Sequence, residues 1–341
     1  MDIQQDELNS ILQDYEIIPE YTEALSKKAL KVHTSKGNYV LKRLAKPSNH
    51  QFVQSFLTLD QHRYTSYVPI VNNKYQQSLS KLGNDYYYIM PWLPNDYNEE
   101  LDARHQYLFK ELAALHHRTE VERKLQAQEA ENHYTKMIKK WEEDKEFYER
   151  FVEHCEQKLY LSPFELQAVT YFIEVSRAIE FSAKKLKEWS ESMENKEKSR
   201  IVLTHGKISA HHFLYDKDGT GYLSNFEDAK YASPIDDLLL FMYRTSKTFP
   251  TQCQDCVNWF YTYQNNYPFK EDEMLLFLSY LAYPQRICQL IKQCVKNPSK
   301  YSELEKNKRL IRAYWHFKNI EYLVMKISEV EEKKKLEAAE A

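Results

Sequence analysis

The sequence predicts an α+β fold in two lobes, a small and mostly antiparallel sheet lobe followed by a larger helical lobe. Residues 1–93 hold short strand-like runs separated by turn residues, whereas helical periodicity dominates residues 94–341. A polar, strand-like segment at 201–240 interrupts the helices. A chain of 341 residues has ample material for a buried core. We therefore place the domain boundary after residue 93.

The first lobe is predicted to combine strands with two helices. Leu8, Ile11 and Leu12 have helical spacing near the start of the chain. The predicted helices are Glu7–Tyr15 and Asn49–His62, the second opened by Pro47-Ser48. The predicted strands are Ala24–Thr34, Asn38–Lys46, Val68–Val71 and Tyr86–Trp92, joined in pairs across Ser35-Lys36-Gly37 and Gly83-Asn84.

The second lobe is predicted to be built from helices. A charged helical segment covers 120–198, and Leu161-Ser162-Pro163 breaks it into two helices. Its aromatic residues favour a solvated helix pair packed by one face, with a partner-binding face as the alternative; they include Trp141, Tyr148, Phe172 and Trp189. The other predicted helices are Arg104–Thr119, Pro250–Tyr263, Glu271–Val295 and Tyr301–Ile327, with a frayed tail at Glu329–Ala341.

The segment at 201–240 organises the chain. A buried strand at Ile201–Leu203 leads into a polar loop at His205–Ala210. Two short strands follow, Phe213–Tyr215 and Gly221–Leu223, and Asp218-Gly219 between them is a strong hairpin signal. A second polar cluster, Asn225-Phe226-Glu227-Asp228, precedes a helix that opens near Ser233-Pro234. Two polar loops at the ends of neighbouring strands are typical of a phosphotransfer site.

These motifs resemble the catalytic segment of the aminoglycoside phosphotransferase and choline kinase group, a branch of the protein-kinase-like fold. That family has His-Gly-Asp-Leu-x-x-x-Asn, a hairpin, Ile-Asp-Phe-Glu and a downstream Asp-Leu. The positions that match its scaffold are His205, Gly206, Phe226, Glu227 and Asp237. The chemical positions differ: Lys207 stands at the catalytic Asp, His212 at the metal-binding Asn, and Asn225 at the metal-binding Asp.

The resemblance also implies a nucleotide site. Lys42 in Tyr39–Leu44 would be the phosphate-binding lysine, with an ordinary exposed strand lysine as the alternative. Met90 lies in the stretch that resembles the linker between the lobes, where adenine would meet backbone groups. The helix expected to supply a glutamate to Lys42 holds no Glu, and its only acid is Asp60. No glycine precedes Gly37 to form a phosphate loop.

The substitutions argue against phosphotransfer. A charged lysine carries only donors, so Lys207 cannot accept a substrate proton. Magnesium requires hard oxygen ligands, whereas His212 offers nitrogen and Asn225 a single neutral oxygen. We therefore assign no catalytic residue and no metal ligand, and we expect a degenerate, pseudokinase-like site. Lys207 is a candidate to replace the charge of the metal in binding ATP or another anion. The alternative is an active small-molecule phosphotransferase with unusual site residues.

Within this group the chain resembles the spore-coat-associated proteins of endospore-forming bacteria, the CotS, YutH and YsxE relatives. That resemblance rests on the whole chain and on its degenerate motifs; the 27 tyrosines are compatible with a coat setting. It implies a protein made in the cytoplasm of the mother cell and deposited in the spore coat. Its partners would be other spore coat proteins.

Composition excludes some other classes of function. The net charge of −3 gives no basic field for nucleic acid, and no apolar run is long enough to span a membrane. The polar N-terminus predicts an intracellular protein. Five cysteines fit a reducing compartment. Cys253 and Cys256 have the spacing of a redox or zinc pair, but no second pair accompanies them, which favours chance placement in a helical turn. The histidine pairs at 116–117 and 211–212 are expected to be structural rather than ligands.

Overall fold

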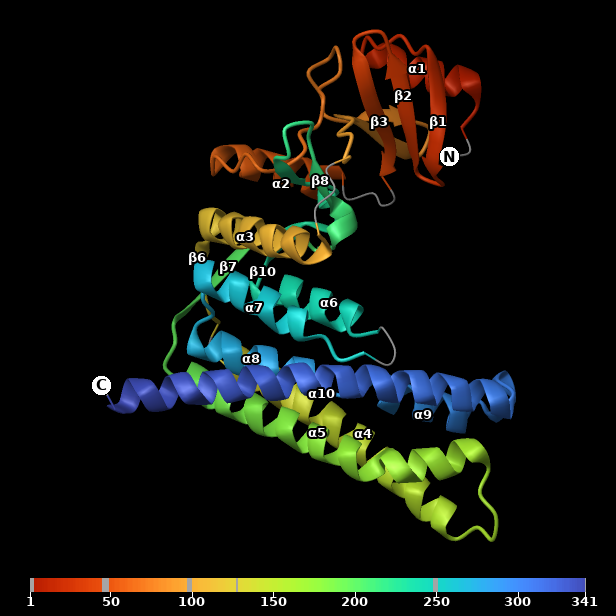
Figure 1. Ribbon diagram of the computed structural model, residues 1–341, viewed down its shortest axis with the longest axis vertical. Coiled ribbons are helices and arrows are strands. Elements are labelled where there is room, and N and C mark those ends of the chain that lie inside the picture. Colours follow the sequence, from red (N-terminus) through yellow and green to blue (C-terminus); the bar gives the residue numbers. More distant parts are fainter. Residues whose placement is uncertain (1–2, 45–48, 97–99, 127, 248–250, 341) are drawn as a thin grey trace. The chain divides into compact units, whose positions relative to one another are not determined.

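The structure, a computed structural model, describes residues 3–44, 49–96, 100–126, 128–247 and 251–340 (Figure 1). The chain forms two compact units. Unit 1 comprises Met1–Val121 and Ile201–Ser233, and unit 2 comprises Glu122–Arg200 and Pro234–Ala341. The predicted α+β class, with a small antiparallel sheet and a larger helical part, is confirmed. The predicted division at residue 93 concerns lobes rather than these units, and it stays a prediction.

Unit 1 contains an antiparallel sheet of five strands among its described residues. The strand order is β1-β2-β3-β5-β4. The strands are β1 Tyr21–Ser26, β2 Ala29–Thr34, β3 Gly37–Leu44, β4 Ser80–Leu82 and β5 Asp85–Pro91. Helix α1 (Gln5–Asp14) lies beside the sheet in Figure 1. Leu8, Leu12, Leu41 and Ile89 belong to the buried cluster that joins this helix to the sheet.

The alternation of side chains along β3 and β5 gives the sheet two chemically different faces. Leu41 and Ile89 are register partners and point toward the α1 cluster. Lys42 and Tyr88 are the next register pair, so they lie on the opposite face. Residues two apart share a face, which places Met90 on the same face as Tyr88. The sheet therefore presents Lys42 away from its apolar α1 core.

Two strand predictions in unit 1 are wrong. The segment predicted as one strand, Ala24–Thr34, contains the hairpin of β1 and β2, in which Ser26 pairs with Ala29. The two turn residues there are lysines, so the usual Asn-Gly or Asp-Gly signal is missing. Val68–Val71 forms only bridges: Val68 donates its N–H to Leu223, and Val71 pairs with Ile89. The strand joined to β5 across Gly83-Asn84 is β4 instead.

The other elements of unit 1 carry the polar loops. They are α2 Asn49–Gln61, α3 Leu101–Thr119, the end of β7 (Lys198–Thr204), the short helix η1 Ala210–His212, β8 Phe213–Tyr215, β9 Gly221–Leu223, η2 Phe226–Asp228 and β10 Lys230–Ala232. The predicted hairpin is confirmed, with Phe213 opposite Leu223. Strand β10 pairs antiparallel with β7, and Tyr231 lies opposite Leu203. The predicted helix opening at Pro47-Ser48 and the strand end at Lys46 lie outside the described residues.

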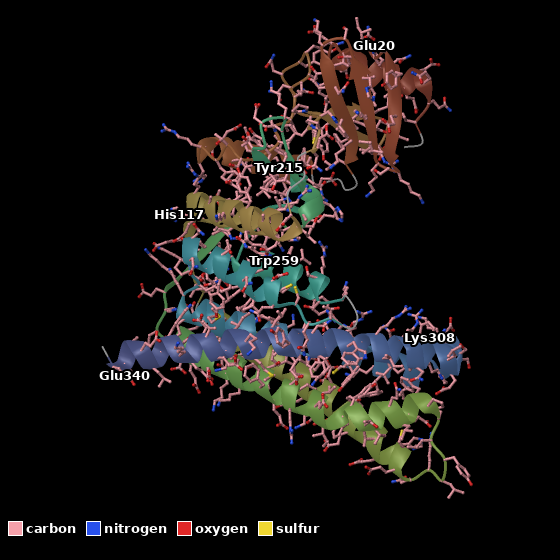
Figure 2. The ribbon with its side chains drawn as sticks, viewed as in Figure 1. Glu20, His117, Tyr215, Trp259, Lys308 and Glu340 are labelled. Atoms are coloured by element: carbon pink, nitrogen blue, oxygen red, sulfur yellow. The ribbon has the colours of Figure 1, made fainter. Side chains whose placement is uncertain are left out.

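Unit 2 is helical. The chain enters it along β6 (Val121–Lys124), so the predicted helical segment begins as a strand. Its helices are α4 Glu129–Glu156, α5 Pro163–Met193, α6 Ile235–Thr245, α7 Gln254–Asn266, α8 Glu271–Ala282, α9 Gln285–Lys296, η3 Pro298–Lys300 and α10 Glu303–Glu340. Figure 2 labels Trp259 on α7, with Lys308 and Glu340 toward the two ends of α10.

Packing decides between the two alternatives for the aromatic residues of unit 2. The favoured helix pair packed by one face is confirmed, because Trp141, Tyr148 and Trp189 are buried in one core cluster and Phe172 packs against it; the alternative, a partner-binding face, is wrong. The predicted break before α5 is confirmed: Ser162 caps the helix and accepts the N–H of Glu165. The segment Glu271–Val295 is two helices with Pro284 between them, since proline cannot continue α8.

The chain end is also more regular than predicted. The segment expected to fray from Glu329 continues as α10 through Glu340. Lys333 and Glu337 form an ion pair one turn apart, which suits a helix of this composition. No helix within the described residues is both long and apolar enough to cross a membrane.

Candidate functional site

The loop after β7 is fixed by a glycine. Gly206 has a φ of +74°, a conformation that glycine adopts without steric cost. A Cβ atom at this position would lie 2.2 Å from the backbone oxygen of Asp228, so the two polar loops approach each other through the missing side chain. The His-Gly pair therefore has a steric role: it lets the loop at 205–210 pack onto the loop at 225–228.

His205 ties the same two loops together from the inside. Its ring is fully buried, and Nε2 lies 2.8 Å from the backbone oxygen of Ser224. Nδ1 accepts the backbone N–H of Lys207 at 3.2 Å, which makes Nε2–H the donor to Ser224. The ring of Phe226 lies 4.8 Å from that of His205, and Phe226 is also fully buried. His205 and Phe226 therefore form a buried frame that holds the two polar loops together.

Lys42 reaches this frame from β3. Its Nζ donates a hydrogen bond to Oδ1 of Asn225 at 2.9 Å and lies 3.7 Å from Oε1 of Glu227. The Tyr88 hydroxyl donates to the same Glu227 oxygen at 2.9 Å. Burial lowers the pKa of Lys42, and the nearby Glu227 carboxylate opposes that shift. The pair is only partly exposed, at 18% for Lys42 and 15% for Glu227, so the two charges are mainly neutralised by each other.

His212 completes the network as a neutral ring. Nδ1 lies 2.8 Å from the backbone oxygen of Lys207, so Nδ1 carries the proton and donates. Nε2 then accepts a hydrogen bond from the side-chain amide of Asn225 at 3.3 Å. Burial lowers the pKa of His212 to about 4, and the positive charges of Lys42 and Lys207 act in the same direction. Asn225 therefore bridges a lysine and a histidine with the two ends of one amide group.

Lys207 contributes charge to the site. Its backbone is held by His205 and His212, and its ammonium lies close enough to lower the pKa of both Lys42 and His212. Among the residues that the structure describes, no carboxylate forms an ion pair with Lys207, whereas Glu227 serves Lys42. Within the hydrogen-bonded network the charges of Lys42 and Glu227 offset each other and His212 is neutral, so the nearby ammonium of Lys207 adds a positive charge that favours an anion over a cation.

The residues present do not fit magnesium. The only side-chain oxygen at the family's metal positions is Oδ1 of Asn225, and it already faces the ammonium of Lys42. His212 offers a nitrogen, which is a poor ligand for this hard cation. Within the described part of the chain, no cluster of three or more histidine, cysteine, aspartate or glutamate residues could hold a metal ion. No step through a bound metal follows from this geometry.

The structure brings together most of the residues singled out from the sequence. Lys42, His212 and Asn225 form one hydrogen-bonded chain, and the backbone of Lys207 adjoins it through His212. Lys42 is not an ordinary exposed lysine. Met90 is buried in β5 on the same face, and its contact with a nucleotide stays a prediction.

Two other positions singled out from the sequence lie on helices. Asp237 lies buried in α6 of unit 2. Asp60 accepts a hydrogen bond from the Tyr67 hydroxyl and forms no ion pair with Lys42 among the described contacts. Sequence reasoning missed the partner of Lys42, because it searched α2 for a glutamate and assigned Glu227 to the scaffold. Tyr88 was missed as well, although its position opposite Lys42 in two adjacent strands is a signal that could have found it.

The fold is shared with solved phosphotransferase structures. An aminoglycoside phosphotransferase from Alicyclobacillus acidocaldarius subsp. acidocaldarius is 14% identical, covers 94% of this chain and 96% of its own, and has a TM-score of 0.69. Spectinomycin phosphotransferase, solved with ADP and spectinomycin, is 15% identical over 94% of this chain and 99% of its own, at a TM-score of 0.56. Amicoumacin kinase, solved with AMP-PNP, Ca²⁺ and Ami, is 13% identical over 94% of both chains, at 0.51.

No protein-family model and no curated protein sequence matches this chain. At these identities the structural neighbours establish the kinase-like fold alone.

Proposed function

We propose that this chain is a catalytically degenerate kinase-like protein that works through protein contacts, as a spore coat component or assembly scaffold. The observation that carries the first half of this proposal is the hydrogen bond from Lys42 to Oδ1 of Asn225. Through this hydrogen bond, Oδ1 of Asn225, which is the one side-chain oxygen at the family's metal-binding positions, faces a lysine instead of a metal ion. The second half rests on the whole-chain resemblance to spore-coat-associated proteins.

The position of the catalytic base supports inactivity. In kinase-like phosphotransfer an aspartate in the first loop accepts the proton of the substrate hydroxyl and orients that oxygen. Lys207 stands there, and a charged ammonium has no lone pair to accept a proton. Lys42, whose ammonium lies nearby, adds a like charge rather than an acceptor. The Nε2 lone pair of His212 is not available to accept the substrate proton, because Nε2 already accepts a hydrogen bond from the side-chain amide of Asn225.

The retained charges support anion binding without a metal. Magnesium in a phosphotransferase offsets the negative charge of the nucleotide phosphates. Here Lys207 stands beside Lys42 without a carboxylate partner among the described residues, so it supplies one uncompensated positive charge. We propose that ATP or another phosphate-bearing anion, where it binds, is held by these two lysines independently of magnesium.

An active small-molecule phosphotransferase is the second candidate. The observation in its favour is the Lys42–Glu227 ion pair, because kinases also hold their phosphate-binding lysine with a glutamate. The named activities of the structural neighbours point the same way. On this alternative, Lys207 would act in turnover with a hydroxyl acceptor, and ATP would be the phosphate donor.

The test replaces the network in a sporulating host. The variant carries Lys42→Ala, Lys207→Ala and Asn225→Ala together, and a strain lacking the protein gives the loss-of-function phenotype. A scaffold predicts normal coat assembly in the triple variant, provided that the purified protein stays folded. A coat defect equal to that of the deletion, in a folded variant, would decide against the scaffold.

A matched control distinguishes the effect of substitutions in the network from the effect of similar substitutions on the surface of unit 1. Lys36→Ala, Asn84→Ala and Lys217→Ala replace the same residue types at exposed positions outside the network. The scaffold proposal expects both triple variants to assemble alike.

A further inference from the structure

Cys253 and Cys256 lie at the start of α7 in unit 2. Cys253 is the N-cap residue of that 13-residue helix, with extended backbone angles of φ −112° and ψ 94°. Its sulfur accepts the backbone N–H of Cys256 at 3.3 Å. Cys253 therefore lies at the N-terminus of α7, which is the positive end of the helix dipole. Its sulfur points back toward the backbone N–H of Cys256.

The two cysteines are joined by the hydrogen bond from the Cys256 backbone to the Cys253 sulfur, and their thiols are chemically unequal. Hydrogen bonding to the side chain and backbone of Cys256 lowers the pKa of Cys253 to about 7, against partial burial and the charge of Asp255, which both raise it. Hydrogen bonding to Cys253, together with burial, raises the pKa of Cys256. Cys253 is partly exposed, whereas Cys256 is fully buried. A reagent from solvent thus meets Cys253 first.

This asymmetry matches the two roles in thiol–disulfide exchange. The attacking thiol needs access and a pKa near the ambient pH, because the thiolate is the nucleophile. The resolving thiol needs only to reach the sulfur of its partner. The Cys253 sulfur already lies 3.3 Å from the backbone nitrogen of Cys256 in the reduced chain, so the two cysteines are close along the first turn of α7.

We propose that Cys253 and Cys256 are a reversible dithiol–disulfide couple, with Cys253 as the attacking and Cys256 as the resolving cysteine. The Cys253 thiolate attacks one sulfur of a small disulfide RSSR and forms a mixed disulfide, while RS⁻ leaves and takes up a proton. The Cys256 thiol then loses its proton and attacks the Cys253 sulfur, which releases the second RS⁻. Two thiols are oxidised to one disulfide as RSSR is reduced to two RSH.

The remaining chemistry of the pair is limited by its surroundings. A structural zinc site needs four ligands, and the described residues offer no cluster of three or more candidates. Cys155, Cys288 and Cys294 are buried, and burial raises the pKa of each, so they serve as internal controls for unreactive thiols. The exchange reaction is the use that this geometry favours.

The experiment equilibrates the full-length, reduced chain with glutathione buffers of increasing glutathione disulfide content at neutral pH. Acid quenching and alkylation precede peptide mass spectrometry. Trypsin cleaves after Lys247 and Lys270, so both cysteines fall in one peptide. We expect that peptide to lose the mass of two hydrogens and to escape alkylation as the buffer becomes oxidising. Cys155, Cys288 and Cys294 should stay alkylatable after unfolding at every ratio.

Two variants assign the roles. Cys256→Ser should trap glutathione on Cys253 as a mixed disulfide, because the resolving thiol is gone. Cys253→Ser should leave Cys256 unmodified in the folded protein, because Cys256 is shielded from solvent. Circular dichroism and the melting temperature of the reduced proteins verify that both variants are folded.

Measurements on the unmodified chain test the proposal even if a variant misfolds. Absence of the internal disulfide at every buffer ratio would overturn it. So would a native alkylation rate of Cys253 no higher than those of Cys155 and Cys294, since the exposed, low-pKa thiol should react at least about tenfold faster.

Discussion

The ammonium of Lys42 lies 2.9 Å from the side-chain oxygen of Asn225 and donates a hydrogen bond to it. The amide nitrogen of the same Asn225 donates to His212. An aspartate at this position would present two anionic oxygens, whereas the asparagine satisfies a lysine and a neutral histidine at once. The side-chain amide of Asn225 therefore links Lys42 to His212.

The Lys42–Glu227 pair should couple energetically. We expect Lys42→Met to lower the free energy of unfolding by about 1–3 kcal/mol, because it leaves a mostly buried carboxylate without its cation. In the double variant with Glu227→Gln, part of that cost should vanish, giving a coupling energy of about 1 kcal/mol. Urea denaturation of the four proteins measures it.

The control for this cycle is the exposed pair Arg43–Asp85, which lies on the same sheet with 36% and 48% of its side chains exposed. Arg43→Met and Asp85→Asn should show a coupling below about 0.5 kcal/mol. Equal coupling in the two cycles would contradict the buried, mutually neutralising arrangement at Lys42.

Gly206 should be intolerant of a side chain. Gly206→Ala places a methyl group against the Asp228 backbone in a left-handed conformation, so we expect a loss of stability well above about 1 kcal/mol. Gly83→Ala is the matched control, because Gly83 also has a positive φ of +59° but has no atom within 4 Å of the added Cβ. Equal decreases in the unfolding midpoints of both variants would show that the close approach of the two polar loops is not the reason why a glycine is needed at position 206.

His212 should remain neutral well into the acidic range. Its folded-state pKa of about 4 lies below the ordinary value of 6.5, so between these values the unfolded chain binds the proton and the folded chain does not. Stability should therefore fall as the pH drops from 6.5 toward 4, by up to about 1 kcal/mol per pH unit from this residue.

An NMR titration checks this directly. The ring signal of His212, assigned by its loss in His212→Gln, should titrate with a midpoint near 4. A midpoint at 6 or above would mean that the Nε2 lone pair is open to solvent and that the Asn225 bridge is absent.

The sequence predicted the local frame well because its signals are local. Asp218-Gly219 determines the hairpin, and His205-Gly206 can be matched as a motif, since backbone geometry demands those residues. The charge pairing was not predictable in the same way. Glu227 lies 185 positions from Lys42 in the chain, and only the packing of the loops against β3 brings the two charges together.

Burial decides between the alternatives for unit 2. Trp141 and Trp189 lie among charged residues in the sequence, and their place in the core cluster confirms the favoured packing by one face over an exposed aromatic face. The Cys253–Cys256 spacing was visible in the sequence, but the position of Cys253 as the cap of α7 depends on where that helix begins.

Nucleotide binding, if retained, should not need magnesium. We expect the ATP affinity measured by calorimetry to change by less than about threefold between magnesium and EDTA buffers. Lys207→Ala should weaken binding in EDTA by about tenfold or more, as expected for loss of a contact to a charged group. Lys217→Ala, which removes an exposed lysine of unit 1, should have no effect. Binding that requires magnesium would contradict the charge role of Lys207.

Phosphoryl transfer from ATP in the presence of magnesium tests the central claim most directly. The acceptors are aminoglycosides, choline and sugars, and the proteins are the unmodified chain, Lys207→Ala and Lys207→Asp. General-base catalysis raises a reaction rate by roughly 10²–10⁴-fold, so an intact site would give a rate well above that of a reaction without the protein. We expect background rates for all three proteins, because Lys207→Asp restores the base but leaves His212 and Asn225 unable to hold magnesium. Magnesium-dependent turnover by the unmodified chain that is lost in Lys207→Ala would contradict it.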